Sequence, residues 1–561
     1  MQASRRAFLQ AAGVLGIGAL TTSCETTGKS HRADQGTRRP NVVLIISDDQ
    51  GYADLGCHGN PDVQTPNIDS LHAQSTRFTN FHVNPVCTPT RACLMTGRYN
   101  FRTGAIDTYR GRAMMAPDEI TMAESFRASG YRTGIFGKWH LGDCYPMRAM
   151  DQGFEESVIH HGGGLGQPSD VPGSGYFNPV LSHNGVEQQY EGYCTDVFAS
   201  ATIEFIKANR EVPFFAYVPT NAPHSPLLVD EKYVVPYRAK GLSETTSKLY
   251  GMITNLDENV GRILSAIDDA GLRDDTIVIF MTDNGPYRVD ETRFTAGMRG
   301  EKGTVYQGGI RVPLFVRYPK RFQAGADCDA LAAHIDLLPT LAELCDVKLP
   351  QSASLDGISL VPGLKRPLPS RTIFAQWHRG DAPELYNNCM ARDERYKLVN
   401  GRELYDLIND PAESADIAGQ HPDIVQRLRN DYERWFADVC STRGFGTNRI
   451  YLGAPESPVV YLTQQDWRGV GSSKESEVGT WELEVLAEGP YKVTVRLPKR
   501  ENPGKVHLGG AAAPAVVNSD AGQEVCYFDG VRFVPGPAGL RIWLESGEAE
   551  FGATHVYISK A

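Results

Sequence analysis

The sequence has no internal repeat, no long low-complexity segment and no CxxC pair among its eleven cysteines. It therefore lacks the cysteine spacing of structural zinc sites and gives no sign of a disulfide framework. Nine cysteines remain once Cys24 and Cys87, which are discussed below, are set aside. We expect these nine to be mostly buried thiols.

An excess of positive charge is also absent, because 56 Lys and Arg face 67 Asp and Glu, a net charge of −11. This balance argues against a nucleic-acid partner. An anionic substrate would have to be attracted by a local basic pocket. The chain has 561 residues, 41% hydrophobic and 22% charged, which is typical of a globular protein with more than one domain.

The N-terminus predicts an export signal over residues 1–24, followed by a polar tether over 25–39. Ser4–Gln10 resembles the twin-arginine export motif, and the apolar run Ala7–Leu20 is too short for a spanning helix. Cys24 follows small residues and is a candidate lipid anchor, although Leu20 lies four residues before it rather than three. We expect a periplasmic protein or a membrane-anchored lipoprotein of a bacterium. The alternative is an amphipathic or disordered tail.

Residues 40–345 alternate short apolar runs with helical patterns, which is typical of βαβ units. This predicts an α/β fold with a large, mostly parallel sheet flanked by helices. β-Branched and aromatic content favours strands at 42–46, 134–136, 214–218 and 277–281.

Polar residues follow each of these strands. They are Asp48 and Asp49, Lys138 and His140, His224, and Asp283 and Asn284. Because ligands bind outside the carboxyl ends of the strands in open α/β sheets, we expect these side chains to share one site. Asp48, Asp49, Asp283 and Asn284 offer only oxygen ligands, which favour Ca²⁺ or Mg²⁺ over zinc. Alternatively, Asp48-Asp49 caps a helix and Asp283-Asn284-Gly285 forms a turn.

The segment Cys87–Gly97 resembles the sulfatase signature C-x-P-x-R-x-x-L-x-T-G at every fixed position. In that family the cysteine is oxidised to formylglycine by a maturation enzyme, and a hydroxyl of the hydrated aldehyde attacks the sulfur of a sulfate ester. The resemblance implies that Cys87 becomes this formylglycine. It also implies a calcium ion held by Asp48-Asp49, Asp283-Asn284 and the modified Cys87. Alternatively, Cys87 is a buried thiol before a helix, with Thr88 as N-cap and Pro89 as the first helical residue.

Three further segments resemble sulfatases. Gly130–His140 matches the second signature, and Lys138 and His140 should share a face if the strand geometry continues through them. The resemblance implies that Arg91 holds the diol, that Lys138 contacts sulfate and diol, and that His140 removes a proton from the diol. Ala222–Pro226 supplies His224 as sulfate contact and general acid. Gly300–Pro313 supplies Lys302 as a second sulfate lysine, with Gln307 where many relatives have Glu.

Two regions follow the core. Residues 346–450 resemble the small C-terminal α+β subdomain of sulfatases, with strands around Asn400-Gly401 and a helix over Ile424–Val439. Residues 451–561 show period-two patterns, with a turn at Gly489-Pro490, that predict an accessory antiparallel β-sandwich. This sandwich could bind carbohydrate or be a structural appendage, and we favour the appendage.

The loop around His160, His161 and Gly162–Gly164 either lines the substrate pocket or lies on the surface.

The resemblance as a whole implies a formylglycine-dependent type I sulfatase, arylsulfatase-like, with the fold of the alkaline phosphatase superfamily. The expected substrate is a sulfated carbohydrate or an aryl sulfate. One alternative is a phosphonate or phosphate ester hydrolase on the same fold. Another is a glycan-binding pseudoenzyme, which predicts the loss of a catalytic residue. Against that alternative, the full set is present: Cys87, Arg91, Lys138, His140, His224 and Lys302.

Overall fold

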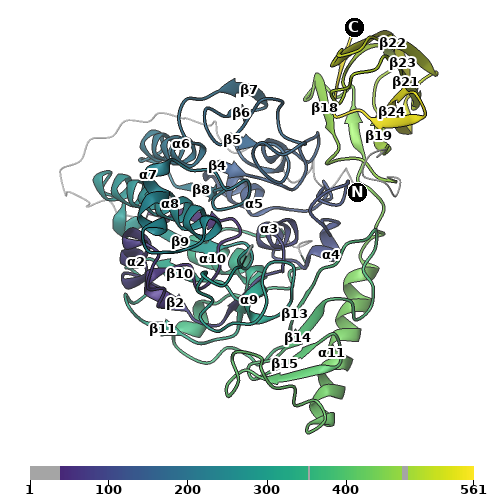
Figure 1. Cartoon of the computed structure of the whole chain (residues 1–561). Helices are drawn as coiled ribbons and strands as arrows, with labels where there is room; N and C mark the ends of the chain where they lie inside the picture. Colours follow the sequence, from purple (N-terminus) through teal and green to yellow (C-terminus); the bar gives the residue numbers. More distant parts are fainter. Residues whose placement is uncertain (1–37, 288, 351–353, 470–477) are drawn as a thin grey trace, which may run out of the picture.

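The computed structural model describes residues 38–561 except 288, 351–353 and 470–477 (Figure 1). The predicted export signal, the candidate lipid anchor Cys24 and all but the end of the tether lie outside the described residues. Within the described part of the chain, no helix has the length and apolar character needed to cross a bilayer.

A ten-stranded mixed sheet forms the centre of the molecule, in the order β11-β2-β10-β9-β1-β8-β4-β5-β6-β7. Its five middle strands are parallel to one another. They are β9 (Thr276–Thr282), β1 (Asn41–Ser47), β8 (Phe214–Pro219), β4 (Arg132–Lys138) and β5 (Glu156–His160). The outer strands are β11 (Asp327–Cys328), β2 (Thr76–Phe78), β10 (Leu314–Arg317), β6 (Val180–His183) and β7 (Val186–Gln189). This confirms the predicted sheet and its four strands.

Helices cover both faces of this sheet, as Figure 1 shows. One face packs against α3 (Cys87–Thr96), α5 (Met122–Ala128) and α10 (Leu337–Cys345). The other packs against α2 (Pro66–Ala73), α6 (Cys194–Ala208) and α8 (Glu244–Asp269). Val42, Leu44 and Ile46 of β1 face the first set of helices, and Val43 and Ile45 face the second. A parallel strand buried on both faces explains the unbroken apolar run in the sequence.

A smaller unit follows, with a four-stranded antiparallel sheet and one long helix. The strands are β13 (Ile373–Gln376), β14 (Cys389–Arg392), β15 (Tyr396–Val399) and β16 (Glu403–Asp406). Helix α11 (Pro422–Ser441) buries Leu428, Tyr432 and Trp435 in the same apolar cluster as these strands. The predicted hairpin and helix are confirmed.

The last part of the chain forms two packed β-sheets that bury Trp467 and Trp481 between them. One holds β17 (Ile450–Leu452), β19 (Trp481–Val485), β24 (Gly536–Ser546), β21 (Gly504–Gly510), β22 (Ala515–Ser519) and β25 (Ala549–Gly552). The other holds β18 (Val459–Thr463), β26 (His555–Lys560), β20 (Gly489–Arg496) and β23 (Val525–Phe533).

Two details of the predicted sandwich were wrong. The β17–β19 pair is parallel, so the sandwich is not antiparallel throughout. Gly489 and Pro490 open β20 instead of forming a turn, because they pair with Phe533 and Arg532 of β23. Proline is tolerated at the start of a strand.

The ten described cysteines are free thiols, and Cys57 and Cys440 are the partly exposed ones among them.

Candidate active site

The predicted site residues meet at the carboxyl edge of the parallel strands, where α3 begins. Cys87 is the first residue of α3, Val86 is its N-cap, and the thiol is fully buried. The alternative in which Thr88 caps the helix and Pro89 is its first residue does not hold, because Val86 is the N-cap. At the N-terminus of a helix, the backbone dipoles and free N–H groups favour bound anions. The start of α3 thus offers free backbone N–H groups beside residue 87, although burial raises the pKa of the Cys87 thiol itself.

His140 presents one ring nitrogen to Cys87. Its Nδ1 lies 3.4 Å from the Cys87 Sγ, while its Nε2 lies 2.7 Å from the backbone carbonyl oxygen of Thr108. A carbonyl oxygen only accepts, so Nε2 carries the proton and Nδ1 presents its lone pair to Cys87. Burial, and then the charge of Lys138, lower the pKa of His140 and keep the imidazole neutral.

The strand geometry does not continue through this signature. β4 ends at Lys138, and His140 has a left-handed φ of 56°. The condition for the predicted shared face, a strand that continues through His140, is therefore not met. Both still reach the site, because the chain turns after Lys138.

Each acidic side chain of the predicted metal site pairs with one predicted cation. The pairs are Lys138 Nζ–Asp48 Oδ2 at 2.7 Å, Lys302 Nζ–Asp49 Oδ1 at 2.5 Å and Arg91 Nη2–Asp283 Oδ2 at 2.6 Å. Three carboxylates and three cations thus cancel within a buried cluster. Burial and then Asp48 raise the pKa of Asp283 to about 6, although Arg91 and Lys138 act in the opposite direction.

Three buried oxygen atoms of this cluster have no hydrogen-bond partner. They are Asp48 Oδ1, Asp49 Oδ2 and Asn284 Oδ1. Unpaired buried acceptors are costly, and carboxylate and amide oxygens are the ligands that hard divalent cations prefer. Asp283 completes the set, with Oδ1 accepting from the Asp49 backbone N–H at 3.3 Å. The residues therefore fit a calcium or magnesium ion.

His224 follows β8 and lies beside Asp49 in this cluster. Its Nδ1 donates to the Ser225 carbonyl oxygen at 2.7 Å, and its Nε2 lies 3.7 Å from Asp49 Oδ2. Burial lowers the pKa of His224 to about 3, although Asp49 acts in the opposite direction. All ten predicted catalytic and metal-binding residues therefore lie in one buried cluster.

Comparisons with known proteins agree with this arrangement. Residues 40–347 match the family model described as Sulfatase. The chain belongs to the sulfatase family. Residues 300–436 also match the model for the C-terminal region of N-sulphoglucosamine sulphohydrolase. This member is a sulfuric ester hydrolase with an alkaline-phosphatase-like fold.

Its relatives include human arylsulfatase A, 33% identical over 76% of this chain and 92% of that protein. Human N-acetylgalactosamine-6-sulfatase is 30% identical over 61% of this chain and 69% of that protein. Among solved structures, Ps i-CgsB in complex with k-i-k-neocarrahexaose superposes with a TM-score of 0.66 and 28% identity. That match covers 72% of this chain and 93% of the other.

The glycine loop of this sulfatase lies directly against both histidines. A Cβ on Gly163 would lie 3.1 Å from Cε1 of His140, and one on Gly164 would lie 3.2 Å from Nδ1 of His224. The loop therefore lines the site, and residues larger than glycine would crowd the two rings. The run Gly162–Gly164 was the sequence signal for this role.

Substituting Gly164→Ala should lower kcat for sulfate ester hydrolysis about tenfold, since a 1 Å misplacement can cost about 100-fold. The added methyl group would press on the His224 ring at Nδ1, the atom that anchors it to Ser225. Gly175→Ala is the matched control, because its Cβ would meet no atom within 4 Å. Equal kcat values for the two variants would show that the loop does not constrain His224.

Sequence reasoning missed two groups that contact His140. The Thr108 carbonyl oxygen accepts from His140 Nε2, and the Gln465 amide nitrogen lies 2.7 Å from the same oxygen. Neither Thr108 nor Gln465 lies in one of the sequence motifs described above. Gln307 is hydrogen-bonded to His82 through its side chain and to Glu413 through its backbone N–H, and forms part of the support for the Lys302 segment.

A loop of the C-terminal subdomain also reaches the active site. Arg379 donates to the Thr108 hydroxyl at 3.0 Å and to Asp107 at 2.8 Å. Trp377 lies against Gly303, the residue after Lys302, where a Cβ would meet its ring at 3.2 Å. An exposed arginine and an indole thus lie beside the catalytic residues.

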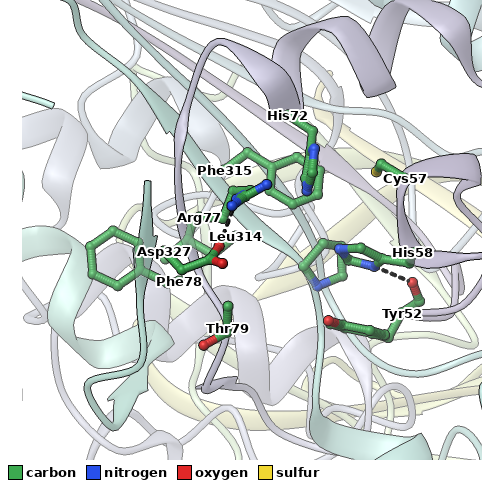
Figure 2. Close-up of a pocket in the computed structure, with 11 residues that line it drawn as sticks. Tyr52, Cys57, His58, His72, Arg77, Phe78, Thr79, Leu314, Phe315 and Asp327 are labelled. Carbon is green, nitrogen blue, oxygen red and sulfur yellow. Dashed lines mark hydrogen bonds and ion pairs between the residues drawn. The ribbon is translucent and has the colours of Figure 1, made fainter. Parts of the chain in front are cut away.

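A separate hollow of about 310 Å³ lies elsewhere and is lined by none of the predicted site residues (Figure 2). It brings Cys57, His58 and His72 together, with Tyr52 stacked on the His58 ring at 3.9 Å. His58 Nδ1 donates to the Tyr52 carbonyl oxygen at 2.7 Å. The sequence spacing of these residues did not reveal the group.

Proposed function

We propose that this sulfatase hydrolyses O-sulfate esters of a carbohydrate, with a nucleophile made from Cys87 beside a calcium ion. The observation that carries the proposal is Cys87 at the start of α3, facing the unprotonated Nδ1 of His140. In the mature enzyme, a formylglycine hydrate at residue 87 would supply the attacking oxygen. In this proposal the Cys87 sulfur stands in for the diol oxygens.

The oxygen atoms of Asp48, Asp49, Asp283 and Asn284 would hold the cation. A calcium ion there would polarise the sulfate group and favour ionisation of the attacking hydroxyl. Calcium is the family expectation, and magnesium also accepts this donor set. The three unpaired oxygens support the site.

The lysines and the arginine would then bind the anionic ester. In the cation-free cluster, Lys138 and Lys302 are held by Asp48 and Asp49. A divalent cation bound to these carboxylates would compete with the lysines for them. The cluster of three carboxylates and three cationic side chains would then carry a net charge of plus two. Both lysines could then donate to sulfate oxygens, while Arg91 keeps its bond to Asp283. Preorganised positive charge of this kind stabilises the transition state.

The two histidines would move the protons. The neutral His140 Nδ1 is placed to accept a proton from the group at residue 87, which expels sulfate and regenerates the aldehyde. His224 would protonate the leaving alcohol. Its pKa of about 3 in the substrate-free cluster means that the imidazole is neutral there. The negative charge of a bound sulfate ester would raise that pKa, so that His224 could take up a proton from solvent and pass it to the leaving alcohol.

A carbohydrate substrate is supported by the site's surroundings and by its relatives. Arg379 and Trp377 beside the catalytic residues suit the anionic and apolar faces of a sulfated sugar. One relative is named for N-acetylgalactosamine-6-sulfate, and one solved neighbour holds a neocarrahexaose. We also propose export through the twin-arginine-type signal, after a maturation enzyme has oxidised Cys87 in the cytoplasm.

The test is release of inorganic sulfate from a panel of sulfated glycans, their oligosaccharides and one aryl sulfate. The enzyme is produced with a cysteine-oxidising maturation enzyme, and matched phosphate esters are assayed in parallel. We expect release from at least one glycan, at rates well above those for the phosphate esters. Faster hydrolysis of the phosphate esters, with the aldehyde verified, would contradict the proposal and favour phosphorus ester chemistry.

A further inference from the structure

The C-terminal sandwich places one side chain in contact with the active site. Gln465 lies in the turn that follows β18 and is 8% exposed. Its side-chain Nε2 is 2.7 Å from the Thr108 carbonyl oxygen and 3.3 Å from His140 Nε2. A residue more than 300 positions away in sequence thus joins the hydrogen bond that orients His140.

Hydrogen-bond chemistry fixes the orientation of this amide. The Thr108 oxygen only accepts, so the Gln465 nitrogen must face it and donate. His140 Nε2 donates to the same oxygen, whose two lone pairs are then both used. The two nitrogens, 3.3 Å apart, are both donors and form no bond with each other. Thr108 is thereby held in the position that keeps the His140 proton on Nε2 and its Nδ1 free.

The loop that carries Thr108 is also fitted to the sandwich through its backbone. The Gly111 N–H donates to the Gln465 carbonyl oxygen at 2.6 Å. Gly111 has a φ of 67°, and a Cβ on it would lie 3.0 Å from the Asp466 carbonyl oxygen. Only glycine meets both conditions without strain. Gln465 therefore holds the loop twice, once by its backbone and once by its side chain.

The sandwich is packed against the catalytic domain as part of one core. Met114, Cys144 and Met147 of the catalytic domain belong to the apolar cluster that also contains Trp467 and Trp481. On its other side, His555 Nε2 donates to the Asp170 carbonyl oxygen at 3.0 Å. Figure 1 shows β18 and β19 as the part of the sandwich nearest the catalytic domain. Contacts of this kind hold the turn at Gln465 in a fixed place.

We propose that the sandwich is a structural part of the active site and that Gln465 is a positioning residue for His140. The sandwich, which was expected to be a structural appendage, thus influences the reaction by holding the Thr108 carbonyl oxygen that accepts from His140. The kinetic consequence rests on the proposed function, because it concerns the proton that His140 accepts. The structural consequence, the proton on His140 Nε2, does not depend on turnover.

The experiment compares Gln465→Met with Gln464→Met in the full-length, mature enzyme. Methionine keeps the length of the side chain and removes the donor, and Gln464 is the adjacent glutamine. We expect Gln465→Met to lower the steady-state rate of sulfate release about 10- to 100-fold, as the loss of an orienting contact does elsewhere. KM should fall together with kcat, because slower sulfate expulsion lowers both and leaves kcat/KM nearly unchanged. Because His140 acts in sulfate expulsion, an aryl sulfate should give a burst of the alcohol before slow turnover.

A second measurement reads the histidine directly. In protein labelled with ¹⁵N-histidine, the wild-type His140 resonances should report a proton on Nε2, with His140→Ala used for assignment. Gln465→Met should shift the population towards the other tautomer or broaden these resonances. Gln464→Met should leave them unchanged.

Several results would overturn the proposal. Unchanged kinetics and unchanged His140 resonances in Gln465→Met would show that the amide does not position the ring. Equal effects of the two substitutions, or an effect on KM alone, would assign Gln465 a merely structural role. Failure of the wild-type enzyme to release sulfate would contradict the proposed function. In that case the ¹⁵N measurement would still decide the positioning role, since it needs no substrate.

Discussion

Replacing Cys87 with alanine is expected to abolish sulfate release, with a loss of at least about 10⁴-fold, as seen when catalytic nucleophiles are removed. The methyl group cannot be oxidised to an aldehyde, so no hydrated oxygen would stand opposite His140 Nδ1. Folding should change little, because the thiol makes one long contact of 3.4 Å and lies in the first turn of α3. The measurement is sulfate released per mole of enzyme, with melting temperature as a check.

Cys93→Ala is the matched control for this prediction. Cys93 lies on the same helix, is equally buried, and accepts a hydrogen bond from Asn84 at 3.3 Å. Its loss should lower stability by about 1–2 kcal/mol and leave turnover largely unchanged. Mass spectrometry of the tryptic peptide containing residue 87 completes the test. A fully active wild-type enzyme with an unmodified thiol at this position would refute the formylglycine proposal.

The part of the fold that could be predicted from the sequence is the part governed by local patterns. The apolar runs at 42–46, 214–218 and 277–281 identified the buried parallel strands, because such strands need apolar residues on both faces. The polar residues after them identified the site, since parallel strands end at one edge. The resemblance to sulfatase signatures identified three further site residues that do not come directly after those strands, namely Cys87, Arg91 and Lys302.

The rest depended on contacts between distant segments, which a single sequence does not encode locally. Thr108 acts through a backbone carbonyl, so its side-chain type carries no signal. Gln465 reaches His140 only because the sandwich is packed against the catalytic domain. The turn after Lys138 likewise overrode strand alternation, and His140 reached the site by a left-handed backbone conformation. In each case tertiary packing decided a feature that periodicity could not.

Chelation should lower the activity of the mature enzyme roughly 100-fold or more, because Lewis-acid stabilisation is worth several kcal/mol and about 1.4 kcal/mol corresponds to tenfold in rate. Added Ca²⁺ should restore activity, and Zn²⁺ should not, since all the ligands are oxygens. Full activity after exhaustive chelation, with metal content verified by elemental analysis, would contradict the calcium site.

Assigning the cation to these residues requires a substitution that does not strand a buried charge. Asp283→Ala would leave Arg91 fully buried without its partner, at a cost of about 3–5 kcal/mol, so lost activity could reflect unfolding. Asn284 is the better position, because it is neutral and its Oδ1 is one of the unpaired oxygens. Asn284→Ala should raise the Ca²⁺ concentration for half-maximal activity by about 10- to 100-fold.

Asn41→Ala provides the comparison that separates cation binding from stability. Asn41 is equally buried and is the first residue of β1, at the end of the strand away from the active site. Its side-chain amide donates to the Thr276 hydroxyl at 3.2 Å. Its loss should cost about 1–3 kcal/mol of stability without changing the Ca²⁺ dependence. If both variants show the same Ca²⁺ dependence as the wild type, the oxygen cluster does not hold the cation. A shift confined to Asn284→Ala would place the cation at the ends of β1 and β9, beside Cys87.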